Sequence, residues 1–144
     1  VHAVCLDLAR MIVADGEGAS RVLEVEVTSA ATAAQAREVA HTVGSSLLVR
    51  TAIAGGDPNW GRIIAAIGRT TAEFKPEEIR VEANLVPLFA GGGPVADHED
   101  AAARAFGAER VNIRIDLNAG DARDTHLTCD LTTDYVRINA DYTT

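Results

Sequence analysis

Helical spacing of apolar positions recurs in five stretches of this 144-residue chain. In the first stretch Val4, Leu8 and Ile12 fall on one stripe, as expected for an amphipathic helix. The second stretch is Ala-rich, and it either continues beyond Gly44 or breaks there into a further element. Asp97 is the expected cap of the fourth helix. The expected helices are residues 2–14, 32–41, 59–68, 97–106 and 134–140.

Alternation of apolar and polar positions separates these stretches and predicts strands. In the first strand Glu24 and Glu26 are expected to face solvent, while the residues between them face a core. Pro87 is expected near an edge or turn of a strand or hairpin. Residues 118–121 join the last two strands, which favours an antiparallel pair, and the composition of residues 91–94 favours a loop. The expected strands are residues 21–29, 79–89, 110–117 and 125–131.

This alternation of helices and strands predicts an α/β fold, a two-layer sandwich in which a mixed β-sheet packs against helices. The length is that of one domain, covering residues 1–144. Aromatic residues make up only 4% of the chain, so the core is expected to consist mainly of Ala, Val, Leu and Ile.

Charge and cysteine usage narrow the functional classes. The net charge of −8, with Lys75 as the only lysine, argues against binding to nucleic acid. No apolar run approaches the roughly 20 residues of a membrane helix, and no signal segment opens the chain. Cys5 and Cys129 lie far apart in apolar patterns and are expected to be buried thiols, which favours a reducing, cytoplasmic setting. The four His residues are dispersed, and neither they nor the Asp residues near the C-terminus indicate a metal site.

The segment GGDPNWGR at residues 55–62 combines turn-forming residues with the only Trp of the chain. It is interpreted as a shaped loop leading into a helix, with Asp57 or Asn59 as the cap and Pro58 in the first turn. Arg62 could clamp a carboxylate, or it could pair with Asp57 and hold the loop in shape; the structural role is favoured. Loops of this kind often carry function, but a plain helix–helix connection whose Trp fills the core is an equal alternative.

Two further motifs accompany this loop. Residues 11–21 read MIVADGEGASR, and residues 129–144 read CDLTTDYVRINADYTT. The three motifs, in this order and at these separations, resemble the C-terminal part of the ornithine acetyltransferase family, the bifunctional glutamate N-acetyltransferases of arginine biosynthesis. The resemblance covers essentially the whole chain.

The resemblance implies transfer of an acetyl group from N-acetylornithine to glutamate, without a metal or organic cofactor. It implies a precursor that cleaves itself before a Thr, which becomes the N-terminal nucleophile of a β chain. A glycine-rich run ending in Met-Ala-Thr marks that cut in the family, and no such run occurs here. The resemblance therefore implies that this chain is the later part of the β chain, without catalytic residues of its own. Its expected partners are the α chain and the rest of the β chain, in heterodimers that pair further.

Three substrate-binding residues follow from the resemblance. Glu17 would bind an amine of the substrate, Asn139 would hydrogen-bond its amino-acid part, and Thr144 would bind its carboxylate. Asp57, Asn59 and Arg62 would support the loop. Read from the residues alone, Glu17 could be an exposed turn residue. The last residues could likewise form a frayed tail, unless apolar anchors dock it: Tyr135, Ile138 and Tyr142.

A second hypothesis comes from a different class, a stand-alone amino-acid-binding or assembly module without catalysis. An enzyme part should expose an apolar face where the remaining chains pack, whereas a stand-alone module should have that face covered or polar.

Overall fold

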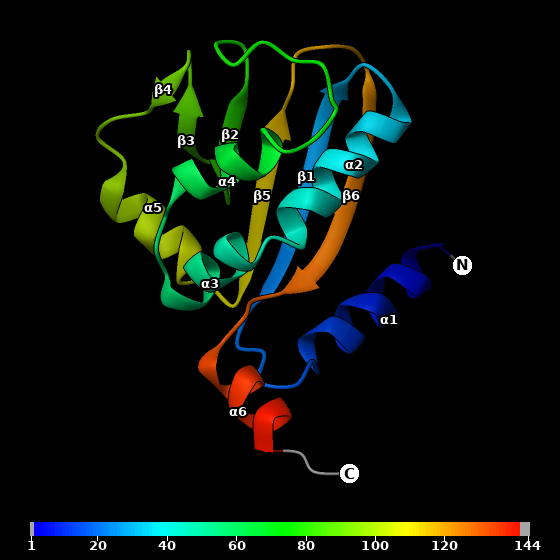
Figure 1. The fold of residues 1–144 in the computed structure, drawn as a ribbon, viewed down its shortest axis with the longest axis vertical. Coiled ribbons are helices and arrows are strands. Elements are labelled where there is room, and N and C mark those ends of the chain that lie inside the picture. The colour runs from blue at the N-terminus through cyan, green and yellow to red at the C-terminus, as the bar shows by residue number, and fades with distance from the viewer. Residues whose placement is uncertain (1, 142–144) are drawn as a thin grey trace.

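One mixed β-sheet with helices packed on one of its faces forms the body of the protein (Figure 1). The structure, a computed structural model, describes residues 2–141. The strands are β1 (Val22–Ala30), β2 (Arg80–Ala83), β3 (Val86–Ala90), β4 (Gly93–Pro94), β5 (Arg110–Asp116) and β6 (Ala122–Cys129). Their order across the sheet is β4-β3-β2-β5-β1-β6, and only β1 and β5 run parallel. The predicted α/β fold with a mixed sheet is confirmed.

The predicted pairing of the last two strands is wrong, because β1 lies between β5 and β6. Val25 of β1 has Ile113 of β5 on one side and His126 of β6 on the other. The connection from β5 to β6 therefore crosses the end of β1, where the amide of Ala119 donates to the carbonyl of Ser29. The short connection between β5 and β6 favours direct pairing of these two strands. With β1 between them, the backbone hydrogen-bonding groups on both edges of β1 are paired instead.

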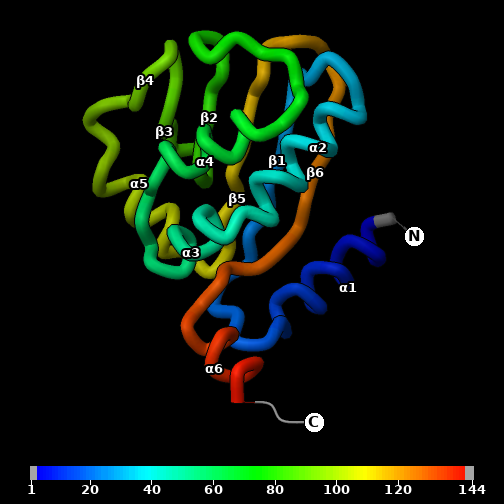
Figure 2. The backbone as a smooth tube through the Cα atoms, viewed as in Figure 1, coloured from blue at the N-terminus to red at the C-terminus, as the bar shows by residue number. Residues whose placement is uncertain are grey.

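The helices are α1 (His2–Ala14), α2 (Ala33–Gly44), α3 (Leu47–Gly55), α4 (Trp60–Ile67), α5 (Glu99–Phe106) and α6 (Thr133–Asp141). Figure 1 shows α2 to α5 over one face of the sheet, and the tube in Figure 2 shows α1 and α6 at its lower end. Alternate residues of β1 face the helix-covered side, and Leu23, Val25 and Val27 are fully buried there. Glu24 points to the other face, where Arg10 of α1 donates to it.

The structure decides two boundaries that the sequence left open and corrects one predicted helix cap. The Ala-rich helix breaks after Gly44, since the Ser46 side chain caps a separate α3 by accepting from the amide of Val49. Asp97 does not cap α5: its φ is 66°, and His98 occupies the N-cap position without a side-chain hydrogen bond. The stretch around Pro87 is a hairpin of β2 and β3, with Pro87 in β3.

The first helix has its predicted bounds but not a buried stripe. Val4, Leu8 and Ile12 remain 61%, 52% and 74% exposed. Cys5 is exposed too, so the expectation of a buried thiol at this position is wrong, whereas Cys129 is partly buried. The helical periodicity predicted the element correctly, but the described residues provide no surface that covers its apolar side.

Candidate functional site

Glu17 and Asn139 lie in contact although they come from opposite ends of the sequence. The side-chain amide of Asn139 donates to Oε2 of Glu17 at 3.1 Å and to the carbonyl oxygen of Tyr135 at 2.9 Å. An amide nitrogen carries two hydrogens, so one Asn side chain can make both bonds at once. Both side chains are exposed, which leaves the second carboxylate oxygen open to a ligand.

The loop that carries Glu17 approaches the first turn of α6 closely. Gly18 has φ of 67°, in the left-handed region, and a Cβ at this position would collide with the backbone nitrogen of Tyr135. Glycine meets both requirements, since it adopts positive φ readily and has no side chain to collide. The glycine after Glu17 thus allows the carboxylate to reach α6.

Thr132 connects the same two segments. Its hydroxyl donates to the carbonyl oxygen of Gly18 at 2.6 Å and accepts from the amide of Tyr135 at 3.3 Å. Thr132 stands just before α6, where a hydroxyl commonly accepts from the third amide along the chain. The cap of α6 is therefore also a link to the loop of Glu17.

Asp130 anchors this region to the sheet. Its carboxylate is buried, with 2% of the residue exposed, and accepts from the amides of Ser20 and Arg21 at 2.8 and 3.1 Å and from the Ser20 hydroxyl. The Arg21 guanidinium donates to the carbonyl oxygens of Ile53 and Ala54 at the end of α3. Buried carboxylates need such donors, so the loop after Glu17 is held firmly at its C-terminal side. Asp130 thus lies directly after the end of β6.

The site has acidic character. Within residues 2–141 no Lys or Arg forms an ion pair with Glu17. An exposed carboxylate beside an amide oxygen and backbone carbonyls matches the donors of a primary amine or ammonium group. The third predicted residue, Thr144, lies outside the described residues, and so does the proposed anchor Tyr142. The other two anchors do not dock into the core, because Tyr135 and Ile138 stay 42% and 41% exposed.

The loop of residues 55–62, the signature loop, stabilises the junction of α3 and α4. Asn59 is the N-cap of α4: its Oδ1 accepts from the amide of Arg62 at 3.2 Å, and its amide donates to Asp57 at 3.1 Å. Pro58 precedes the cap, so its predicted place in the first turn is wrong. Arg62 does not pair with Asp57 either; it donates to the carbonyl oxygen of Leu48 at 2.9 Å and to the Thr51 hydroxyl at 3.2 Å.

Trp60 packs partly buried against the core, with its ring 5.4 Å from that of Phe89. This packing fits the alternative of a plain helix–helix connection whose Trp packs on the core.

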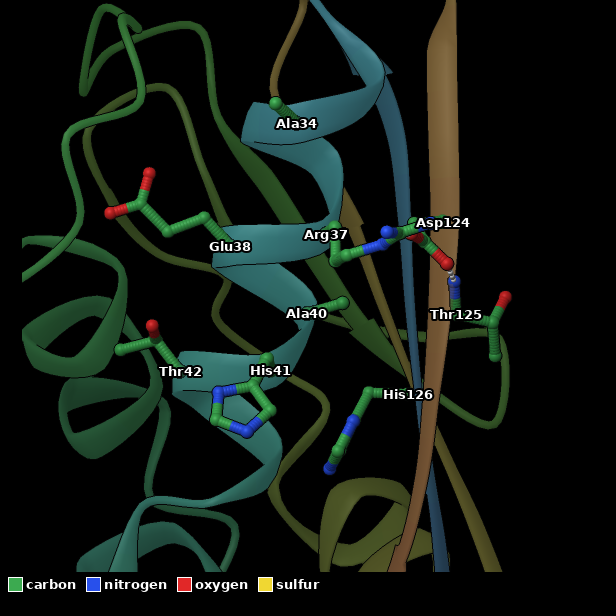
Figure 3. A pocket seen from close by; sticks show the side chains of 9 residues that line it. All are labelled: Ala34, Arg37, Glu38, Ala40, His41, Thr42, Asp124, Thr125 and His126. Atoms are coloured by element: carbon green, nitrogen blue, oxygen red, sulfur yellow. Dashed lines mark hydrogen bonds and ion pairs between the residues drawn. The ribbon is translucent and has the colours of Figure 1, made fainter.

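A separate open cavity of about 570 Å³ lies between α2 and the edge strand β6 (Figure 3). It contains His41 and His126, whose ring centroids are 5.0 Å apart in edge-to-face geometry. Burial lowers the pKa of His126, and the nearby His41 lowers it further, against an opposing effect of Asp124. Arg37 and Asp124 also line this cavity and form an ion pair at 3.0 Å.

The sequence did not indicate this histidine pair, because the two residues belong to different elements. The signal that could have found it is the strand register, since His126 lies opposite Val25 and therefore on the helix-covered face.

Across residues 2–141 no three His, Cys, Asp or Glu side chains gather closely enough to hold a metal ion. No helix in the same range is long and apolar enough to cross a membrane.

Comparison with known proteins gives consistent matches. The sequence profile of the ArgJ family matches residues 1–144. The chain is 46% identical over its whole length to the arginine biosynthesis bifunctional protein ArgJ of Thermus thermophilus, and covers 38% of that protein. It is 45% identical to the glutamate N-acetyltransferase of Methanothermobacter thermautotrophicus, with 99% of this chain and 37% of that protein aligned.

The fold is similar to a crystal structure of the arginine biosynthesis bifunctional protein ArgJ from Bacillus halodurans. The TM-score is 0.92 at 42% identity, over 97% of this chain and 66% of that one. The chain thus spans between a third and two fifths of the length of the curated relatives named above.

Proposed function

Because the chain belongs to the ArgJ family, we propose that it forms part of a glutamate N-acetyltransferase of arginine biosynthesis. The relatives carry the names of arginine biosynthesis ArgJ proteins and of a glutamate N-acetyltransferase. The proposed reaction moves an acetyl group from N-acetylornithine to glutamate, in the cytoplasm, without a metal or organic cofactor.

The contact of Glu17 with Asn139 is the observation that carries the proposal. Glu17 binds the ammonium group of the ornithine or glutamate ligand, because a carboxylate and an ammonium form a charge-assisted hydrogen bond. Asn139 holds the carboxylate of Glu17 at 3.1 Å and presents its amide oxygen to the amino-acid part of the ligand. Thr144 binds the ligand's carboxylate, and Asp57, Asn59 and Arg62 support the neighbouring scaffold.

The chemical step belongs to a Thr outside this chain. Its hydroxyl attacks the amide carbonyl of N-acetylornithine, the C–N bond breaks, and ornithine leaves with the proton released from the hydroxyl. The neutral amine of glutamate then attacks the acetyl ester and passes a proton to the leaving Thr oxygen, which restores the Thr hydroxyl and forms N-acetylglutamate. The described side chains contribute binding and orientation, which accelerate transfer by fixing the reacting groups.

Exposed apolar residues favour the enzyme over a stand-alone binding module. Four large apolar side chains of α1 lie open, with Met11 at 67% and Ile12 at 74% exposure, and α6 has no buried residue. Contiguous exposed apolar residues are typical of surfaces that contact another chain. In the proposed enzyme these surfaces meet the α chain and the rest of the β chain, formed by autocatalytic cleavage and assembled as a heterotetramer.

The first test measures the intact masses of all polypeptides in natively purified protein, together with acetyl transfer from N-acetylornithine to glutamate. A co-purifying chain that begins with Thr, together with transfer activity, is the expected result. A single 15.1 kDa species without activity contradicts the proposal.

A variant of the same preparation then tests the site. Glu17→Gln keeps the shape but removes the charge, so the KM of the amino-acid substrate should rise about 10- to 100-fold. Glu78→Gln is the matched control, since Glu78 also accepts from an Asn side chain, that of Asn118, at 3.3 Å. An unchanged KM in Glu17→Gln refutes the role of Glu17.

A further inference from the structure

A closed ring of hydrogen bonds joins the two segments of the candidate site. The Thr132 hydroxyl donates to the carbonyl oxygen of Gly18, the residue after Glu17. It also accepts from the amide of Tyr135. The carbonyl of Tyr135 accepts from Asn139, whose amide returns to Glu17. Thr132 therefore makes no proposed contact with the ligand, but its side chain links the two segments that carry Glu17 and Asn139.

We propose that Thr132 is a positioning residue that sets the separation of the Glu17 carboxylate and the Asn139 amide, and thereby the affinity for the amino group of the substrate. This inference rests on the proposed function of Glu17 and Asn139. Thr132 does not touch the substrate; it acts through the backbone on both sides of the site.

The geometry around Thr132 explains why its hydroxyl has this effect. The bond to Gly18 is short, at 2.6 Å, and the bond to Tyr135 caps the first turn of α6. Because a Cβ on Gly18 would collide with the nitrogen of Tyr135, the two backbones already lie at their closest approach. A loop at such an approach separates when its bridging group is lost, and the carbonyl of Gly18 then turns to water.

Neighbouring contacts do not replace this link. Asp130 holds the residues after Gly18, at Ser20 and Arg21, against the end of β6. The residues before Gly18 lead back to α1, where the amide of Gly16 bonds to the carbonyl of Val13 within the same segment. The chain after Glu17 is thus anchored to the end of β6, and the chain before it bonds only within its own segment. The Thr132 hydroxyl joins the segment of Glu17 and Gly18 to α6.

A series of variants in the natively assembled protein tests the inference. Thr132→Val removes the hydroxyl and keeps the shape, and Thr132→Ser restores the hydroxyl. Thr70→Val is the matched control, because the Thr70 hydroxyl also bonds to a backbone carbonyl, that of Ile67, at 2.7 Å. Each variant is assayed for KM and kcat of acetyl transfer and for its melting temperature, alone and combined with Glu17→Gln.

The expected result is a rise in KM of about 3- to 10-fold in Thr132→Val, with kcat at saturation changed less than about twofold. Thr132→Ser should return KM to within about twofold of the wild-type value, since one hydroxyl restores both bonds. Thr132→Val should add no further rise in a Glu17→Gln background, because the group it positions has already lost its charge.

Three outcomes overturn the inference. If Thr132→Val lowers the melting temperature as Thr70→Val does but leaves KM unchanged, the role of Thr132 is only structural. If Glu17→Gln raises KM and Thr132→Val does not, this inference fails while the proposed function stands. If Glu17→Gln itself leaves KM unchanged, the proposed function fails, and the inference fails with it.

Discussion

The side chain of Asn139 donates to the carboxylate of Glu17 across 122 positions of sequence. Both residues are exposed, so solvation offsets most of the energy of this bond in the free protein. The contact between Asn139 and Glu17 therefore contributes little to the stability of the fold, but it fixes the direction in which the Glu17 carboxylate faces a ligand.

A double-mutant cycle between Glu17→Gln and Asn139→Leu should show coupling in substrate binding. Each single variant is expected to raise KM, and the double variant should raise it less than the product of the two effects. Residues in one hydrogen-bond network usually couple by about 0.5–3 kcal/mol. KM values of the four proteins, converted to free energies, give the coupling; strictly multiplicative effects would show that the two residues act independently.

Gly18→Ala should destabilise the protein through two separate causes. The left-handed φ of 67° and the collision with Tyr135 together predict a loss of about 1–3 kcal/mol in the free energy of unfolding. Gly56→Ala is the matched control, because Gly56 has a similar φ of 64° but no atom near its Cβ position. Urea denaturation of both variants separates the causes, and equal losses would mean that the approach to Tyr135 costs nothing.

Asn59→Ala should lower the free energy of unfolding by about 1 kcal/mol, since it removes the side-chain cap of α4. Asn59→Asp keeps an acceptor for the amide of Arg62 and should cost less than Asn59→Ala. The comparison by chemical denaturation tests the structural role of the signature loop. A similar loss in both variants would point to the bond with Asp57 instead.

Stability should fall as pH falls below about 6.5, in part through His126. The pKa of His126 is lowered in the folded protein, first by burial and then by His41. The unfolded chain therefore binds the proton at a higher pH, so protonation favours unfolding. The contribution is fully present above the ordinary pKa of 6.5 and is lost as pH falls towards the folded value.

Melting temperatures between pH 5 and 8 measure this slope. His126→Gln should flatten the slope, and His41→Gln should reduce it, because the second imidazole no longer repels the first. His98→Gln serves as the control at a site away from this pair. A slope that persists unchanged in His126→Gln would assign it to other groups.

Ile12→Asp should weaken co-purification with the partner chains of the proposed enzyme. Ile12 is 74% exposed on the apolar side of α1, so a carboxylate there costs the isolated chain little but disrupts an apolar interface. Leu85→Asp is the matched control, because Leu85 is 82% exposed in the turn between β2 and β3. Size-exclusion profiles compare the two variants, and equal assembly would show that α1 is not part of an interface.

Local patterns predicted most of the elements, although they left the break between α2 and α3 open and did not predict β4. The alternation of Leu23, Val25 and Val27 predicted β1 and its buried face, and the spacing around Trp60 predicted α4. Glu17 and Asn139 were expected at the site because the motifs that contain them resemble those of the ornithine acetyltransferase family, whereas their local pattern also fits exposed turn and tail residues.

The arrangement of these elements in space was decided by tertiary structure. β1 lies between β5 and β6 and pairs with both of them, an arrangement that no local pattern encodes. His41 and His126 meet because α2 covers the face of the sheet on which His126 lies. Residues far apart in sequence become neighbours only through packing and strand register. Sequence thus determined which side chains are available at the site, and the tertiary fold determined that Glu17, Thr132 and Asn139 form one network.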